Sequence, residues 1–403
     1  MRRLPTFPVV LAGFAAFLDL YATQPLLPLL ARTFDASTFQ VGLTITAPVI
    51  AVALAAPAVG RLADRIGLRR IIVTSAVLLA VATALAATAT SLAQLVFWRF
   101  MQGVVTPGIF AATIAYVHEV WPPSRAARGT AAYMSGTVLG GFVGRAVAGI
   151  VAADSTWHMS FVALAILNGA VAIALWALMP SEPVDGSMAR THRSETSAHA
   201  PRSRGSVGAL FRNRRLVATF AVGFCVLFTQ VAMFTYVTFL LAAPPFNLST
   251  VALGWLFVVY LVGAAVTPLA GAWVDRYGHR AGLASAMAIG GTGALLTLAP
   301  SLPAIVTGLA LCATGVFIAQ ATSSSYIGAV TTRDRGLAVG LYSTFYYGGG
   351  SAGGALPALF WSRGGWPACV ALVFAVQMTG AVISFTQWTP AAAAPVGEAL
   401  PPA

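Results

Sequence analysis

Three charged side chains of the sequence lie within long apolar stretches, where few residue types can do chemistry. They are Asp19, Arg99 and Arg145. A charge at the depth of a bilayer is costly, so such side chains face the protein interior or water, and they pair or exchange protons. Asp19 is the one acid placed deep in such a stretch. A carboxyl group there can take up and release a proton, and the two arginines are the groups able to modulate it.

Two interpretations of these charges remain open at this level. In one, Asp19 binds and releases a proton while Arg99 and Arg145 tune its affinity for that proton. In the other, Asp19 forms an ion pair with Arg145 that only holds two helices together. Arg99 lies close to an end of its apolar stretch, where a long side chain can also reach the membrane surface.

The elements that must position these charges follow from composition. Of the 403 residues, 58% are hydrophobic and 8% are charged, whereas a soluble protein has about 45–50% and about 25%. The sequence therefore predicts an all-α membrane protein with twelve transmembrane helices. The apolar stretches lie at 8–30, 41–63, 71–92, 94–119, 128–152, 157–179, 216–241, 250–274, 281–300, 303–327, 336–360 and 365–388. Each is long enough to span a bilayer.

The arginines predict an orientation. With both termini in the cytoplasm, 19 of the 23 basic residues fall in cytoplasmic segments, and Arg32 and Arg363 fall outside. This asymmetry is typical of a membrane protein with a basic cytoplasmic side. Contact of this basic side with anionic lipid accounts for the net charge of +12, so binding to nucleic acid is not expected. We expect an N-terminal six-helix bundle at 1–180, a cytoplasmic linker at 181–215, a C-terminal bundle at 216–390 and a tail at 391–403.

A repeated motif relates the two predicted bundles. The segment PAVGRLADRIGLRR at 57–70 aligns with PLAGAWVDRYGHR at 268–280 at an offset of 211. The first copy resembles the loop motif of the major facilitator superfamily, G-x-L-a-D-r-x-G-r-k. This resemblance implies two pseudo-symmetric bundles and transport by alternating access. It also implies a conformational latch, formed by Gly60, Asp64, Arg65, Gly67, Arg69, Gly271, Asp275, Arg276 and Gly278.

A second resemblance concerns the branch of that superfamily. The segment LVFWRFMQG at 95–103 is similar to the l-x-x-x-R-x-x-q-G motif of drug:proton antiporters, and it contains Arg99. The fifth span has Gly140-Gly141 where those antiporters have a Gly-Pro pair, and Arg145 follows. With the FLDLYATQPLLPLL segment of the first span, this pattern looks more like the YnfM type of exporter. Close helix packing is the simpler interpretation of the glycines.

Polar and aromatic side chains within the spans are candidates for a substrate site between the bundles. Polar side chains in membrane helices tend to face protein or water, while aromatic ones do so less regularly. The candidates are Tyr21, Gln24, Gln230, Phe234, Tyr236, Gln320, Tyr346 and Tyr347.

Other functions receive less support. The sequence has no lysine and hence no G-x-x-x-x-G-K-[ST] loop, so energy from ATP is not expected. Neither converging catalytic groups nor metal-ligand spacing is present, so we expect no enzyme activity, no cofactor and no metal. The expected partners are a small organic molecule, protons and membrane lipid. Proton-coupled export across a bacterial-type inner membrane is favoured, with uptake, facilitated diffusion and a membrane sensor as alternatives.

Overall fold

The computed structural model describes residues 6–180, 207–331 and 335–388, and these are almost entirely helical. The first half contains α1 (Thr6–Leu18), η1 (Gln24–Leu26), α2 (Leu27–Thr33), α3 (Thr38–Ile66), α4 (Leu68–Ala86), α5 (Leu92–Val105), α6 (Pro107–Val120), α7 (Pro123–Asp154) and α8 (Trp157–Leu178). The second half contains α10 (Val207–Arg212), α11 (Arg214–Ala242), α12 (Thr250–Trp255), η2 (Leu256–Val258), α13 (Val259–Leu296), α14 (Leu302–Val330), α15 (Arg335–Ala355) and α16 (Pro357–Gln387).

Eight helical stretches of the described residues are long and apolar enough to cross a membrane. The other four predicted spans fall on helices that are interrupted or less apolar. The span at 8–30 is divided among α1, η1 and α2, and the span at 250–274 among α12, η2 and α13. The span at 281–300 lies on the second part of α13, and the span at 336–360 on α15 and the start of α16. The prediction of a helical membrane fold is confirmed.

The connection between the halves differs from the prediction at one end. Most of the expected linker, 181–206, and the expected tail, 391–403, lie outside the described residues. Helix α10, however, occupies the last part of the expected linker. Leu210 on this helix is buried, and the ring of Phe211 packs against Phe220 and Phe345. These apolar contacts explain why the segment is helical.

The first membrane segment is broken in its middle. Helix α1 ends at Leu18, residues 19–23 form turns, and the chain continues through η1 into α2. Pro25 and Pro28 lie in the continuation. Proline lacks a backbone N–H and its ring clashes with the carbonyl four residues earlier, so a continuous helix is disfavoured. The break leaves backbone carbonyls near Asp19 that need other donors.

Glycine makes the same bend in both copies of the repeated motif. Gly67, between α3 and α4, has φ 89° and ψ 147°, and Gly278, within α13, has φ 85° and ψ 164°. Residues with a Cβ rarely adopt this conformation. The bend turns the chain from one membrane helix directly into the next.

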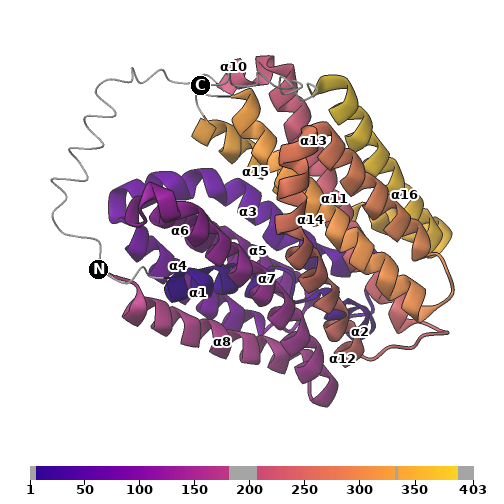
Figure 1. Ribbon diagram of the computed structural model, residues 1–403. Coiled ribbons are helices and arrows are strands. Elements are labelled where there is room, and N and C mark those ends of the chain that lie inside the picture. The colour runs from indigo at the N-terminus through magenta and orange to yellow at the C-terminus, as the bar shows by residue number, and fades with distance from the viewer. Residues whose placement is uncertain (1–5, 181–206, 332–334, 389–403) are drawn as a thin grey trace, which may run out of the picture.

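The two halves lie side by side and meet along two seams (Figure 1). One seam joins α3 to α15, where the Thr46 hydroxyl donates to the Ser351 carbonyl over 3.1 Å. The other joins α7 to α12, where Gly149 faces the Thr250 carbonyl. Both seams lie where α3 and α12 begin and α7 and α15 end, which is the side predicted to face outward. Glycine permits this close backbone approach.

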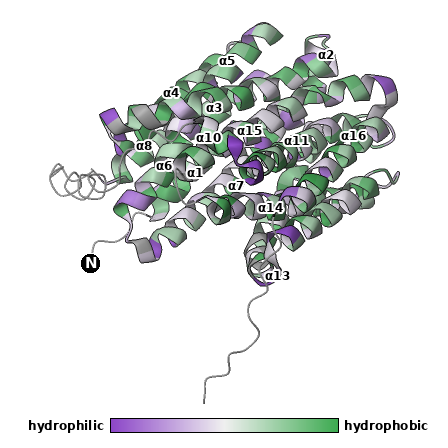
Figure 2. Cartoon of the chain, turned by 90° about the horizontal axis from the view of Figure 1, so that it is seen from above, coloured by the Kyte–Doolittle hydropathy of each residue, from purple (hydrophilic) through white to green (hydrophobic). Residues whose placement is uncertain are grey.

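The outer surface of the bundle is apolar. Ile166, Ile173 and Trp176 on α8 are 65–68% exposed. Figure 2 shows mostly hydrophobic colouring along the helices, with hydrophilic segments mainly near their ends. Exposed apolar surface of this extent is typical of helices in contact with lipid.

Candidate functional site

Arg99 on α5 stabilises the break in the first membrane segment. Its Nη1 and Nη2 donate to the carbonyl oxygens of Asp19 and Leu20 at 2.8 and 2.7 Å, and its Nε donates to the Thr44 carbonyl at 3.0 Å. The side chain is fully buried. The planar guanidinium presents several donors in a fixed arrangement, which suits it to a cluster of carbonyls. Arg99 therefore lies in the interior, which excludes the interpretation that it reaches the membrane surface.

The Asp19 carboxylate lies beside this arginine in a network of neutral hydrogen-bond donors. Its Oδ2 accepts from the Thr83 hydroxyl of α4 at 2.5 Å and from the Asn168 amide of α8 at 2.7 Å. Gln102 of α5 joins the network, since its Nε2 donates to Thr83 at 2.9 Å and its Oε1 accepts from Arg99 at 2.5 Å. We call these five residues the Asp19 network. None is more than 2% exposed.

Two acceptor oxygens of the Asp19 network have no hydrogen-bond partner within residues 6–180, 207–331 and 335–388. They are Oδ1 of Asp19 and Oδ1 of Asn168, both fully buried. Buried polar atoms without a partner are rare, and each calls for an explanation such as a catalytic role or a bound water or ion. A proton on Asp19 Oδ1 would turn this unpaired acceptor into a hydrogen-bond donor. The arrangement is therefore suited to a carboxyl group that gains and loses a proton.

Arg145 on α7 forms a second polar site, between the halves. Its Nε donates to Gln24 Oε1 at 2.7 Å and its Nη1 donates to the Gly141 carbonyl at 2.5 Å. The guanidinium carbon lies 5.1, 4.6 and 5.1 Å from the ring centres of Tyr21, Phe257 and Tyr260. We call these six residues the Arg145 site. Tyr21, Gln24 and Gly141 come from the first half. Phe257 and Tyr260 come from the second.

Asp19 and Arg145 are not paired. The hydrogen bonds of the carboxylate come from Thr83 and Asn168, and those of Arg145 go to Gln24 and Gly141. The suggested ion pair between the first and fifth spans is therefore wrong. The glycines of α7 explain how the helices meet instead, because Gly136, Gly140 and Gly144 lie against the backbone carbonyls of Val10, Phe14 and Leu18 on α1. The interpretation of these glycines as packing positions is confirmed.

Six of the eight predicted substrate residues gather around the Arg145 site. Tyr21 and Gln24 belong to it. The Gln230 side chain lies beside Tyr260, and the Phe234 ring lies 4.5 Å from that of Tyr260. Tyr346 and Tyr347 on α15 have ring centres 5.5 Å apart, and both lie near Tyr21.

The other two predicted substrate residues lie elsewhere. The Tyr236 hydroxyl donates to the Gly354 carbonyl at 2.9 Å, and its ring packs on Phe239 and Trp361. It therefore holds α11 against α15 and α16. Gln320 on α14 is half-buried, and its backbone carbonyl accepts from the Ser324 hydroxyl at 2.7 Å. No described contact joins its side chain to the Arg145 site.

The repeated motif places one arginine against the sixth helix of its own half. Arg69 donates to the carbonyls of Met179 and Trp176 at 2.8 and 2.7 Å, at the end of α8. Arg280 donates to the Phe385 carbonyl near the end of α16. A cation at a helix C-terminus supplies donors to its free carbonyls.

The remaining latch residues are placed as follows. Arg65 and Arg276 are exposed, Arg276 lies over the Tyr277 ring, and Gly271 has open space around it. Gly67 and Gly278 form the bends described above. The side chains of Asp64 and Asp275 and the surroundings of Gly60 lie outside the described part of the structure. The latch therefore stays a prediction.

Several residues of the two sites are not among the sequence-based candidates. Thr83, Gln102 and Asn168 complete the Asp19 network, and Phe257 and Tyr260 complete the Arg145 site. Asn168 is an amide within an otherwise apolar span, which is a signal that sequence can give. The two aromatic residues carry no such signal, because their role follows from the short η2 turn that brings them to Arg145.

Comparison with known proteins agrees with the fold. The sequence profile described as Major Facilitator Superfamily matches residues 9–244 and 232–401. The chain is 28% identical over 371 residues to the MFS-type transporter YybF of Bacillus subtilis, covering 92% of the chain and 90% of that protein. It is 29% identical over 361 residues to the inner membrane transport protein YnfM of Escherichia coli, covering 90% and 85%. The crystal structure of the nucleoside transporter NupG superimposes with a TM-score of 0.73 at 15% identity, covering 96% and 100%.

Proposed function

We propose, from the premise that the chain belongs to the Major Facilitator Superfamily and is a multi-pass membrane transporter, that it exchanges a small organic molecule for protons. The proposed direction is export across the inner membrane, with both termini in the cytoplasm. The single observation that carries the proton coupling is the buried Asp19 carboxylate, whose Oδ1 has no hydrogen-bond partner among the residues that the structure describes.

The hydrogen bonds of the Asp19 network can change when Asp19 takes up a proton. The Thr83 hydroxyl has one hydrogen and two acceptors within reach, Asp19 Oδ2 at 2.5 Å and the Leu79 carbonyl at 2.7 Å. When Asp19 is ionised, that hydrogen goes to the carboxylate. When Asp19 is protonated, the hydroxyl is free to donate to Leu79. One proton thus changes the bond that joins the broken first segment to α4.

Arg99 links this change to the backbone at the break of the first membrane segment. It holds the backbone of Asp19 and Leu20 through two carbonyls, so the main chain that carries the carboxyl group is fixed at the break. Broken helices with polar groups at the break are the usual binding elements of transporters. We infer that a proton enters at Asp19 in one conformation and leaves in the other, while the cargo moves in the opposite direction.

The closed seams at the predicted outer side favour one stage of this cycle. Gly42 and Gly354, like Gly149 and Thr250, are in close backbone contact there. In this conformation the cargo would reach the Arg145 site from the cytoplasmic side. The exposed arginines of the repeated motif lie on that side, where the proposed latch would act once the conformation reverses.

The test is proton flux in proteoliposomes that contain a pH-sensitive dye. A panel of drugs and metabolites is added to wild type, Asp19→Asn and the control Asp154→Asn, which alters an exposed acid at the end of α7. We expect at least one compound to evoke proton movement in wild type and the control but not in Asp19→Asn. A pH difference of one unit should sustain about a tenfold gradient of that compound with one proton exchanged, and none in the variant.

Two results would contradict the proposal. Equal compound movement in wild type and Asp19→Asn, without protons, would indicate facilitated diffusion. Proton and compound movement in the same direction would indicate uptake. Asp19→Asn keeps the shape of the side chain, and its thermal unfolding shows whether loss of flux reflects loss of structure.

A further inference from the structure

In the part of the chain that the structure describes, Arg145 is a buried cation without a counter-ion. Its side chain is 5% exposed, and two of its three guanidinium nitrogens donate to neutral acceptors, the Gln24 amide and the Gly141 carbonyl. Within the described residues, no carboxylate forms an ion pair with it, and Nη2 has no hydrogen-bond partner. Buried charges are normally paired. Something other than the described chain should supply the negative charge.

Aromatic rings, and not carboxylates, surround the guanidinium. Tyr21, Phe257 and Tyr260 present their faces to it at 4.6–5.1 Å. The rings of Phe257 and Tyr260 lie nearly parallel, with 5° between their planes. Ring faces attract a cation, which keeps Arg145 charged and in place, but they do not neutralise it. Beside it Tyr21 and Tyr260 remain 7% and 6% exposed, while Phe257 is fully buried.

The position of Arg145 connects both halves. Its backbone carbonyl lies against Gly254 of α12. Gln24, which orients its Nε, donates in turn to the Thr235 hydroxyl of α11 at 3.1 Å. A molecule bound at Nη2 would therefore contact groups of both halves, which is where a cargo must bind if the halves move around it.

Asp19 is not available as the missing counter-ion. Its carboxylate is held by Thr83 and Asn168, and its backbone carbonyl is held by Arg99. Nor does a purely structural role need a charge, because the Gln24 and Gly141 contacts could be made by a neutral donor. The unpaired charge is thus the feature that requires a ligand.

We propose that Arg145 binds the negative group of the transported molecule, and that this molecule is an organic anion with a flat apolar body. The guanidinium edge accepts a carboxylate through strong charged hydrogen bonds. The apolar body packs against the exposed parts of Tyr21 and Tyr260. This assignment rests on the proposed function in one respect, namely that the chain carries a small molecule between its halves.

The experiment compares three probes with the same flat body and different charge: 2-naphthoate, 2-naphthamide and 2-naphthylmethylamine. Each is added to the purified full-length protein in detergent at constant ionic strength, and thermal unfolding is followed with a thiol-reactive dye. Cys225, Cys312 and Cys369 are buried, so they report unfolding. We expect the naphthoate alone to raise the unfolding temperature of wild type. This comparison needs no variant.

Variants then assign the effect to Arg145. We expect Arg145→Gln to weaken naphthoate binding by about ten- to hundredfold, the loss typical of a hydrogen bond to a charged group, and Arg145→Lys to retain part of it. Arg363→Gln is the matched control, because it removes the same charge from an exposed position. It should bind the naphthoate as wild type does.

The assignment is overturned if naphthoate does not stabilise wild type, if the amide or the amine stabilises it equally, or if Arg145→Gln keeps the preference for the anion. These results are distinct from failure of the proposed exchange. Naphthoate bound through Arg145 but never exchanged for protons would leave the anion site in place and contradict proton coupling. A neutral compound exchanged for protons through Asp19 would support proton coupling and contradict the anion site.

Discussion

The two halves of the molecule share one packing arrangement but differ in what they place inside it. In the first half, Gly140 and Gly144 of α7 lie against the carbonyls of Phe14 and Leu18 on α1. In the second half, glycines of α15 pack on carbonyls of α11 in the same way, with Gly349 against Phe224 and Gly353 against Phe228. The backbone frame is therefore repeated closely enough to compare the side chains position by position.

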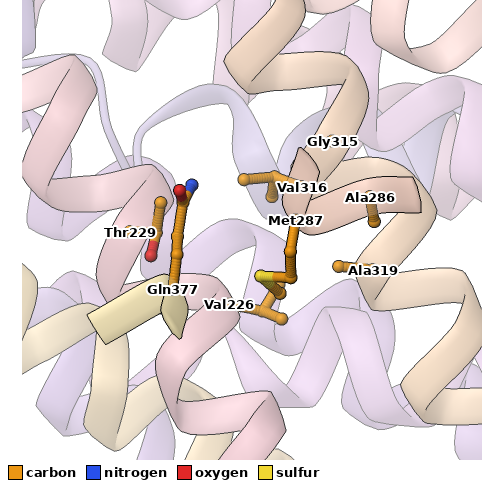
Figure 3. A pocket seen from close by; sticks show the side chains of 8 residues that line it. All are labelled: Val226, Thr229, Ala286, Met287, Gly315, Val316, Ala319 and Gln377. Carbon is orange, nitrogen blue, oxygen red and sulfur yellow. The ribbon is translucent and has the colours of Figure 1, made fainter. Parts of the chain in front are cut away.

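This register sets Asp19, one residue after Leu18, against Thr229, one residue after Phe228. It also relates Asn168 to Gln377, because these two residues are 209 positions apart, as Gly140 and Gly349 are. Thr229 and Gln377 line one small pocket in the second half (Figure 3). The position that holds a carboxylate in one half thus holds a neutral hydroxyl in the other, with an amide beside each.

The seam positions differ in the same sense. Arg145 of α7 corresponds to Gly354 of α15, since each follows the second glycine of its pair. Gly354 lies against Thr46 and Gly42 of α3 and closes the seam there. Arg145 instead brings a charge to the junction of the halves. Under the proposed function, the first half would carry both the proton and the cargo charge, while the second half supplies two of the three rings at Arg145 and a closing surface.

The largest expected effect on stability is that of Arg99→Met, in the charged half. The change removes the donors of three buried carbonyls, those of Asp19, Leu20 and Thr44. Breaking a buried charged network typically costs about 3–5 kcal/mol. We expect a loss of that size in unfolding by SDS titration in mixed micelles. Arg363→Met, at an exposed position, should change stability little, and an equally small effect of Arg99→Met would contradict the role assigned to this side chain.

A smaller effect is expected from Asn168→Ala. The amide donates to Asp19 Oδ2 at 2.7 Å, and its removal leaves the carboxylate with the Thr83 hydroxyl as its remaining side-chain donor. The loss of a buried hydrogen bond of this kind costs about 1–3 kcal/mol. The same SDS titration measures it. Asp19→Asn combined with Asn168→Ala serves as the control, because the cost should fall when no carboxylate remains; an unchanged cost would show that the two side chains do not interact energetically.

The sequence was sufficient for the helical membrane fold, because hydrophobic stretches, arginine positions and the repeated motif are local signals. It also singled out Asp19, Arg99 and Arg145, which the structure buries, since charges in apolar stretches are rare; their role in transport stays a prediction. It could not determine which of them meet. The pairing depends on the break after Leu18 and on the rotation of α5 and α7, which place Arg99, and not Arg145, beside Asp19. Phe257 and Tyr260 were missed because aromatic residues are common in any membrane helix.

The smallest expected effect belongs to the second half, in Gln377→Leu. Gln377 is 3% exposed, and its Oε1 has no hydrogen-bond partner in the described part of the chain. The pocket beside it has room for about one water molecule. Replacing an unpaired buried amide by an apolar side chain of similar size is close to neutral or stabilising, by about 1 kcal/mol. The measurement is again SDS titration, with Asn168→Leu as the counterpart in the first half. If Gln377→Leu is as costly as Asn168→Leu, the amide of the second half has a partner that matters as much as Asp19, and the functional asymmetry of the halves is wrong.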